Sequence, residues 1–146
     1  MSSPRAGNGG ESGECATRRS VADRPLRVLV ADDFILARWA TRRQLEELPK
    51  LQVVGEAVDG FEAVALARTL SPDLVFMDIC MPGLDGLEAT RRITAESPRV
   101  RVVILSSHEQ EAYYQRALAA GAAGYLVKGQ TTQRIAAVIQ QALTRG

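Results

Sequence analysis

Short apolar runs alternate with longer stretches of helical periodicity from Leu26 to the end of the chain. The runs are rich in β-branched residues and almost continuously apolar, which is typical of strands that are buried on both faces. We predict five strands, at Leu26–Ala31, Leu51–Ala57, Leu74–Met77, Val100–Leu105 and Gly124–Val127.

The segments between and after these runs carry apolar residues three and four positions apart, as amphipathic helices do. Clear stripes are Ala63, Leu66, Ala67 and Leu70 in one segment and Ile135, Val138, Ile139 and Ala142 in the last. The helix expected to begin near Phe34 is less regular, with a stripe of Ile35, Leu36, Trp39 and Ala40 from which Leu45 and Leu48 depart. Proline stops the helices that precede three of the strands, at Pro49, Pro72 and Pro98.

This alternation predicts a doubly wound α/β fold with a five-stranded parallel sheet. Parallel neighbours need a crossover connection, and a helix is the usual one. Right-handed crossovers then place helices on both faces of the sheet. All strands of such a sheet end at one edge, and ligands bind there. The residues that follow the strands are therefore the candidates for function.

The first 25 residues differ from the rest, because they are rich in Gly, Ser, Pro and Arg and poor in apolar side chains. Such a segment buries too little apolar surface to offset the entropy of ordering. We predict a disordered N-terminal tail over residues 1–25 and one folded domain over residues 26–146. The whole chain has 18 basic and 17 acidic residues and a formal charge of +1. Direct nucleic-acid binding is not expected, because the chain has no general basic field.

The sequence predicts neither export nor a membrane span. The tail lacks the apolar stretch of a secretory signal, and no segment reaches the ~18 consecutive apolar residues of a membrane helix. The two cysteines, Cys15 and Cys80, and the single histidine, His108, lack metal-ligand spacing, which excludes zinc and disulfide scaffolds. Free thiols fit a reducing compartment, so we expect a cytoplasmic protein.

Charged and hydroxyl side chains follow several predicted strands. Asp32 and Asp33 follow the first strand, Asp78 the third, Ser106 the fourth and Lys128 the fifth. Each has an ordinary explanation, since Asp and Ser often cap helices and a lysine is often a solvated charge. Jointly that explanation is weak, because three crowded carboxylates repel one another unless a cation is present. Oxygen donors without a nearby His or Cys suit Mg²⁺, which would neutralise the remaining charge.

The same residues are suited to accepting a phosphoryl group. A carboxylate can attack phosphorus and form an acyl phosphate. That transfer depends on positioning and on neutralising charge more than on proton chemistry. Mg²⁺ and Lys128 would neutralise charge on the phosphoryl oxygens. The Ser106 hydroxyl would donate a hydrogen bond to another phosphoryl oxygen. We therefore interpret the strand-end cluster as a phosphoryl acceptor.

Four motifs resemble the receiver domain of two-component response regulators. They are the acidic pair in LRVLVADD, FMDICMPGLDG from Phe76 to Gly86, ILSS from Ile104 to Ser107 and GYLVK from Gly124 to Lys128. Each motif is weak alone, but four in the right order at the ends of separate strands are highly specific. The resemblance covers about residues 26–145 and implies a flavodoxin-like (βα)5 fold with strand order 2-1-3-4-5. Motif details are most similar to receivers of LuxR-type transcription regulators.

The resemblance implies a role for each residue at the strand ends. Asp78 would be the phosphorylated residue and would contact Mg²⁺ directly, as would Asp33. Asp32 would reach the ion through water, and the backbone carbonyl of Cys80 would complete the protein ligands. Lys128 would pair with the phosphoryl group.

The resemblance also implies a switch. Ser106 would move toward the phosphoryl group, and Tyr125 would change rotamer with it, although an aromatic residue on a strand is more often part of the core. The face formed by the last two helices and the last strand, called helix 4–strand 5–helix 5 in the family, would change shape. A receiver catalyses only its own phosphorylation and dephosphorylation and is not otherwise an enzyme.

The implied partners are a histidine kinase or a histidine phosphotransfer protein, a downstream protein, and a second copy of the chain in a phosphorylation-dependent homodimer. Two departures from the family stand out. Gly129 replaces a proline that is often cis, and a cis bond before a non-proline residue costs about 2.5 to 4 kcal/mol. The sequence also stops at Gly146, with no effector domain after the last predicted helix.

Three functions therefore stay open. The first is a free-standing receiver that controls a protein partner. The second is the regulatory half of a LuxR-type DNA-binding regulator that lacks its helix-turn-helix. The third and most remote is an Asp-nucleophile phosphatase of the haloacid dehalogenase type. Such a phosphatase needs a second Asp two positions after the first, where this sequence has Cys80.

Overall fold

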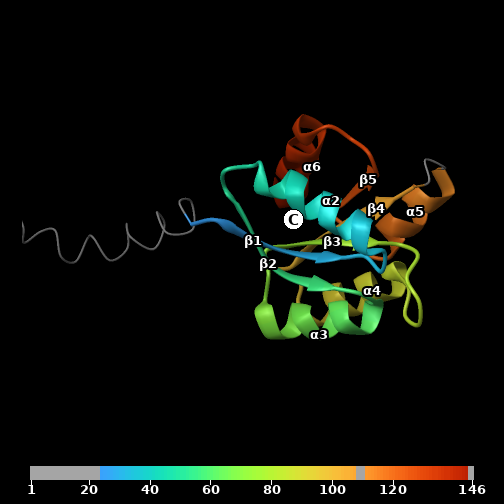
Figure 1. Cartoon of the computed structure of the whole chain (residues 1–146). Helices are drawn as coiled ribbons and strands as arrows, with labels where there is room; N and C mark the ends of the chain where they lie inside the picture. Colours follow the sequence, from blue (N-terminus) through green and yellow to red (C-terminus); the bar gives the residue numbers. More distant parts are fainter. Residues whose placement is uncertain (1–23, 108–110, 145–146) are drawn as a thin grey trace, which may run out of the picture.

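The computed structural model describes residues 24–107 and 111–144. Ten elements alternate between strand and helix (Figure 1): β1 (Leu26–Ala31), α2 (Ile35–Glu46), β2 (Leu51–Ala57), α3 (Gly60–Leu70), β3 (Leu74–Asp78), α4 (Gly86–Glu96), β4 (Arg101–Ser106), α5 (Glu111–Ala119), β5 (Gly124–Val127) and α6 (Thr132–Thr144). The five strands form one parallel sheet in the order β2-β1-β3-β4-β5. The predicted fold class and strand order are confirmed.

The two faces of the sheet carry separate hydrophobic clusters. Along β3, Leu74 and Phe76 belong to one cluster, whereas Val75 and Met77 belong to the other. Successive side chains of a strand point to opposite faces, so a strand buried on both sides needs a continuous apolar run. The first cluster includes residues of α2 and α6, and the second includes residues of α3, α4 and α5, so helices cover both faces (Figure 1).

Two aspartates begin helices at the edge where the strands end. Asp59 is the N-cap of α3, and its carboxylate accepts a hydrogen bond from the Glu62 amide at 2.8 Å. Asp85 caps α4 in the same way, through the Glu88 amide. Gly86 follows that cap, and a Cβ on it would lie 2.0 Å from the carbonyl oxygen of Asp78. Only glycine therefore allows α4 to begin this close to the end of β3.

The helix α6 confirms its predicted buried face, whereas α2 does not. Ile135, Val138, Ile139 and Ala142 are all buried. In α2, which is described in full, the buried residue is Leu45. The predicted apolar stripe faces solvent, and Ile35, Leu36 and Trp39 are between 57% and 65% exposed. The reason is that α2 turns its small side chains, including Ala37 and Thr41, toward the sheet and the β5–α6 loop.

The predicted tail falls largely outside the described residues, which begin at Arg24. Arg24, at the predicted boundary, pairs with Asp73 through both of its terminal nitrogens at 3.2 Å. The disordered tail and the boundary at residue 25 stay predictions. Within residues 24–107 and 111–144, no helix has the length and apolar content that crossing a membrane requires.

Candidate functional site

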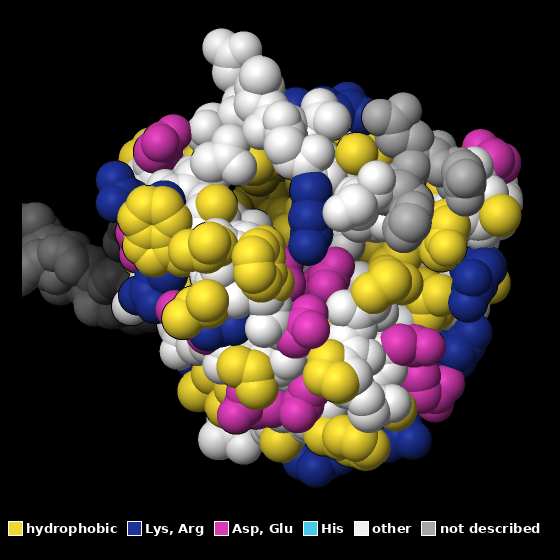
Figure 2. Space-filling model, turned by 45° about the vertical axis from the view of Figure 1, so that its right-hand side comes forward, with side chains coloured by type: hydrophobic (Ala, Val, Ile, Leu, Met, Phe, Trp, Pro, Cys, Tyr) yellow, Lys and Arg dark blue, Asp and Glu magenta, His cyan; other side chains and the backbone are white. Residues whose placement is uncertain are grey.

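The ends of β1, β3 and β5 bring the predicted acidic and basic residues together. Carboxylate oxygens of Asp32, Asp33 and Asp78 all lie within 4.8 Å of one another. Lys128 follows β5, and its Nζ lies 2.9 Å from Oδ2 of Asp32 and 3.2 Å from Oδ1 of Asp78. Figure 2 shows acidic side chains near the centre of one face of the molecule, with a basic side chain beside them. Residues almost a hundred positions apart in sequence thus form one charged pocket.

The pocket changes the acidity of Asp78. The carboxyl group is 10% exposed, and its burial is the main reason that its pKa rises from 3.8 to about 6. The charges of Asp32 and Asp33 also raise the pKa, while Lys128 opposes them. Both burial and like charges disfavour the ionised carboxylate. At neutral pH Asp78 is ionised, but burial and the neighbouring carboxylates disfavour its charge. A bound cation would offset this cost.

Lys128 is the permanent counter-charge of the pocket. Burial alone would lower its pKa, but hydrogen bonds and charges from Asp32 and Asp78 outweigh that effect and raise the pKa above the usual value. The ammonium is therefore charged over the whole physiological range. Because its side chain is 27% exposed, it is also within reach of a group that enters from solvent.

Asp32 is not a helix cap, unlike Asp59 and Asp85. The N-cap of α2 is Phe34, which makes no side-chain capping bond. Asp32 is fully buried. Its Oδ1 accepts a hydrogen bond from the Phe34 amide at 3.0 Å and its Oδ2 accepts one from Lys128. The ordinary explanation of this acidic pair as a cap is therefore wrong for α2.

The donor set fits Mg²⁺. Within the described residues, the three aspartates form a group whose carboxylate oxygens could bind one ion together. Such hard oxygen donors are those that Mg²⁺ prefers. The three carboxylates exceed the single ammonium of Lys128, so a divalent cation would balance the pocket. The Cys80 thiol is exposed, and the role of its backbone carbonyl as a ligand stays a prediction.

Ser106 and Tyr125 occupy the positions that the sequence predicts, but their movement is not tested. Ser106 is the last residue of β4 and is 1% exposed. Its carbonyl accepts a hydrogen bond from the Lys128 amide at 2.7 Å, so it borders the pocket. Tyr125 on β5 is partly buried, and its ring meets that of Tyr114 on α5 edge to face at 5.9 Å between centroids.

Sequence reasoning missed a charged network behind Asp32. Arg38 on α2 donates to the carbonyl oxygen of Asp32 at 2.8 Å and to Glu56 on β2 at 2.7 Å. Arg42 also donates to Glu56. Hydrogen bonds from Arg38, against the effect of burial, lower the pKa of Glu56. Glu56 is the sequence signal that could have indicated this network. It is a lone acidic residue in a predicted strand, and a carboxylate on a strand covered by helices needs a charged or hydrogen-bonding partner.

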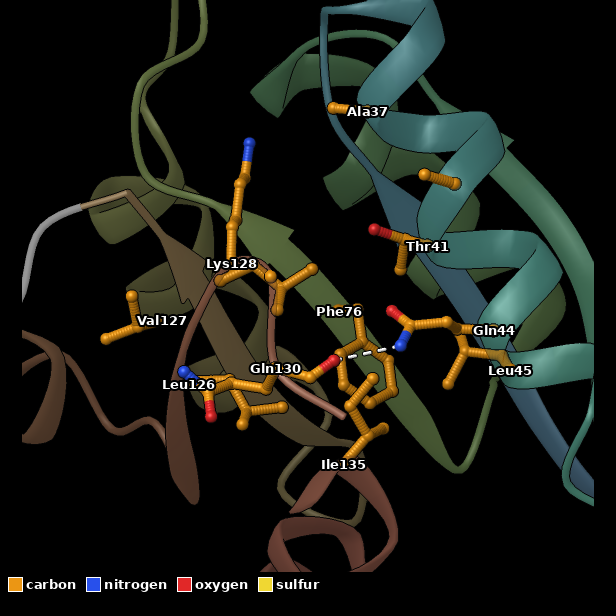
Figure 3. Close-up of a pocket in the computed structure, with 13 residues that line it drawn as sticks. Ala37, Thr41, Gln44, Leu45, Phe76, Leu126, Val127, Lys128, Gln130 and Ile135 are labelled. Carbon is orange, nitrogen blue, oxygen red and sulfur yellow. Dashed lines mark hydrogen bonds between the residues drawn. The ribbon is translucent and has the colours of Figure 1, made fainter. Parts of the chain in front are cut away.

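A cavity of about 170 Å³ lies beside Lys128, between α2 and the β5–α6 loop. Apolar side chains such as Phe76 and Leu126 line it (Figure 3), and the Gln44 amide donates to the carbonyl of Gln130 across it at 2.9 Å. Gly129 in this loop has a positive φ of 90°. No peptide bond of the described residues is cis, which confirms the expectation for the bond after Lys128.

Comparisons with known proteins agree with this geometry. The family model of the response regulator receiver domain matches residues 28–140. Response regulator GacA of Pseudomonas aeruginosa is 42% identical over 116 residues, which are 80% of this chain and 54% of that protein. Response regulator UvrY of Escherichia coli is 42% identical over 115 residues, 79% of this chain and 53% of that protein. The chain spans about half the length of these curated relatives.

A solved structure of a response regulator is also similar to this chain in sequence and fold. A two-component response regulator of the LuxR family from Aurantimonas sp. SI85-9A1 is 36% identical, with a TM-score of 0.77. The match covers 82% of this chain and 85% of that chain. The pocket of three aspartates and one lysine thus lies in a domain whose sequence and fold are those of known receivers, and the chain belongs to the response regulator receiver domain family.

Proposed function

We propose that the chain receives a phosphoryl group on Asp78 from a histidine kinase or a histidine phosphotransfer protein and passes the signal to a protein partner. One observation carries the proposal: the pocket surrounds a single carboxylate with two further carboxylates and an ammonium. Membership of the receiver family supports the same reading. The site belongs to the cytoplasm, where histidine kinases present their phosphoryl groups.

Asp78 would act as the nucleophile. Its carboxylate oxygen forms a bond to phosphorus while the bond from phosphorus to the donor's imidazole nitrogen breaks, and the electron pair leaves with that nitrogen. A pKa of about 6 leaves the carboxylate ionised at neutral pH. The product is a mixed anhydride of the Asp78 carboxyl and phosphate.

The remaining residues would hold charge around the reacting group. Lys128 already lies 3.2 Å from Asp78, so a small displacement brings its ammonium to a phosphoryl oxygen. Asp32, Asp33, Asp78 and the backbone carbonyl of Cys80 would hold Mg²⁺. The chemistry that bound Mg²⁺ supplies is neutralisation of the negative charge on the phosphoryl oxygens.

The output would come from the face formed by α5, β5 and α6. Ser106 lies at the pocket and Tyr125 on this face, so a movement of one after phosphorylation would be transmitted to the other through β4 and β5, which pair directly. The changed face would bind a downstream protein or a second copy of the chain. The only reactions that the chain would catalyse are its own phosphorylation and dephosphorylation.

The phosphodonor would dock beside α2. Phe34, Ile35, Leu36 and Trp39 are each more than half exposed and follow the acidic pair directly in sequence. Figure 2 shows hydrophobic side chains gathered on one side of the acidic centre. Exposed apolar patches of this kind mark protein interaction sites.

Labelling with acetyl phosphate and Mg²⁺ tests the proposal. Intact-protein mass should show one added phosphoryl group, and Asp78→Asn should abolish it. Lys128→Ala should retain part of the labelling but lose the change of the α5–β5–α6 face. Asp59→Asn is the matched control, because it neutralises an aspartate at the same sheet edge while keeping a capping side chain. Undiminished labelling of Asp78→Asn would refute the proposal.

A DNA-binding output is the alternative, since the structure from Aurantimonas is described as that of a LuxR-family regulator. Gel-shift assays with genomic DNA in both phosphorylation states test whether this chain itself binds DNA. The proposal expects no retention of DNA by this chain, and phosphorylation-dependent retention would favour the alternative.

A further inference from the structure

The backbone of Asp32 is held from both sides. Its amide donates to the carbonyl of Ala57 on β2 at 3.0 Å, and its carbonyl accepts a hydrogen bond from Nη1 of Arg38 at 2.8 Å. Its two carboxylate oxygens accept hydrogen bonds from Phe34 and Lys128. Every polar group of this residue therefore has a partner, and Arg38 is the partner whose side chain reaches the residue from outside the pocket and the sheet.

Arg38 is itself fixed at its other end. Its side chain is only 12% exposed, and its Nε donates to Oε1 of Glu56 at 2.7 Å. Arg42 donates to the second oxygen of the same carboxylate. The planar guanidinium can bind a carboxylate with one nitrogen and a carbonyl with another in a fixed geometry, which an ammonium cannot do. Arg38 thus links β2 rigidly to the turn that carries Asp32 and Asp33.

This turn is under electrostatic stress. Asp32, Asp33 and Asp78 repel one another, and Lys128 lies against only two of them at ion-pair distance. This repulsion favours an outward movement of the Asp32–Asp33 turn, which would separate the three carboxylates. The hydrogen bond from Arg38 opposes that movement from behind the pocket.

We infer that Arg38 is a positioning residue for the divalent-cation site, and that its clamp on the Asp32 carbonyl keeps the acidic pair close to Asp78 before a cation binds. The inference rests on the proposed function for its biological meaning. Among the described residues, Arg38 reaches the acidic pair through the main-chain carbonyl of Asp32, so it acts through the main chain.

Removing the Arg38 charge changes Mg²⁺ affinity in opposite directions if the residue positions the site and if it acts only through its charge. Arg38 is cationic, so removing its charge would relieve its long-range Coulomb repulsion of Mg²⁺ and would strengthen Mg²⁺ binding. Loss of positioning predicts the opposite, because groups that orient metal ligands typically contribute about 10-fold to 100-fold to metal affinity. We therefore expect Arg38→Gln to weaken Mg²⁺ binding by at least about 10-fold.

The experiment is calorimetric titration of the full chain with Mg²⁺ alone, well below the melting temperature of every variant. Arg38→Lys should recover part of the affinity, since the ammonium can reach the carbonyl or Glu56 but not both. Glu56→Gln should weaken binding less than Arg38→Gln, and the double variant should resemble Arg38→Gln alone, because the two residues act as one unit. Arg68→Gln is the matched control, since Arg68 pairs with Glu96 across the exposed α3–α4 surface and should leave the affinity unchanged.

Two results would overturn the inference. Mg²⁺ affinity of Arg38→Gln that equals or exceeds that of the wild type, even with a lower melting temperature, would leave Arg38 a purely structural residue. An equal loss in Arg68→Gln would show that the loss does not depend on the clamp between Arg38 and Asp32. Failure of the proposed function would give different results. The wild type would then bind no Mg²⁺, or the Asp78→Asn variant would still be labelled.

Discussion

Helices α2 and α6 cover the same face of the sheet but are held there by different forces. The inner face of α6 consists of four buried aliphatic residues. In α2 the buried residue is Leu45, and polar bonds from Arg38, Arg42 and Gln44 attach the helix to β2 and to the β5–α6 loop. Packing thus holds α6 in place, whereas α2 exposes Ile35, Leu36 and Trp39 to solvent next to the acidic pocket. Under the proposed function, α6 would stabilise this face and α2 would provide the recognition surface.

The largest effect is expected from a pair of truncations that compares the two helices directly. Ile139→Ala in α6 removes a side chain that is 6% exposed, and Leu36→Ala in α2 removes one that is 63% exposed. The first should lower the free energy of unfolding by about 2 to 5 kcal/mol. The second should change it by less than about 0.5 kcal/mol. Urea denaturation measures both values, and similar losses in the two variants would contradict the comparison.

The next effect, of comparable or smaller size, is expected from Asp78, because burial and the neighbouring carboxylates make its ionised form costly for stability. Its pKa is about 6 in the folded protein and 3.8 without the fold. Between these values the folded state binds more protons than the unfolded state, so this group's contribution to the free energy of unfolding falls as pH rises from about 4 to 6. Two pKa units correspond to about 3 kcal/mol.

Metal-free Asp78→Asn should therefore be more stable than the wild type at pH 7, and the advantage should shrink as the pH falls toward 4. Denaturation of both proteins in the presence of a chelator measures the difference. Mg²⁺ should stabilise the wild type more than the variant. A difference in stability that stays constant over this pH range would show that Asp78 does not titrate with a raised pKa.

Trp39→Ala should have the smallest effect on stability. It should slow phosphotransfer from a kinase selectively, without changing labelling by a small phosphodonor. Trp39 is 57% exposed, so its loss should change the free energy of unfolding by less than about 0.5 kcal/mol. Tryptophan often dominates the binding energy of protein interfaces. Phosphotransfer from the cognate kinase should slow by about 10-fold or more, while labelling by acetyl phosphate stays unchanged. Equal slowing with both donors would place the effect in the pocket instead of in docking.

Sequence reasoning located the strands and the charged residues at their ends well, because both depend on local signals. Buried parallel strands must be continuously apolar, and the bounds of β1, β2 and β5 agree with the prediction. The carboxyl ends of parallel strands share one edge, so the convergence of Asp78 and Lys128 followed from the fold class alone. The strand order came from the family resemblance, since alternation of elements does not fix it.

Two features could not be derived in this way. Apolar spacing gives the helical period of α2 but does not say which side faces the sheet, so the exposure of Leu36 and Trp39 was missed. The link from Arg38 to Asp32 and Glu56 depends on the position of α2 relative to β2, which no local pattern encodes.

The most direct test of the account is to identify the phosphorylated residue chemically. Borohydride converts an aspartyl phosphate to homoserine, and peptide mass spectrometry then locates the converted position. After incubation with acetyl phosphate and Mg²⁺, the account predicts homoserine at position 78 alone, and none when Mg²⁺ is removed by a chelator. Conversion at position 32 or 33, or phosphate on a residue that borohydride does not reduce, would contradict it.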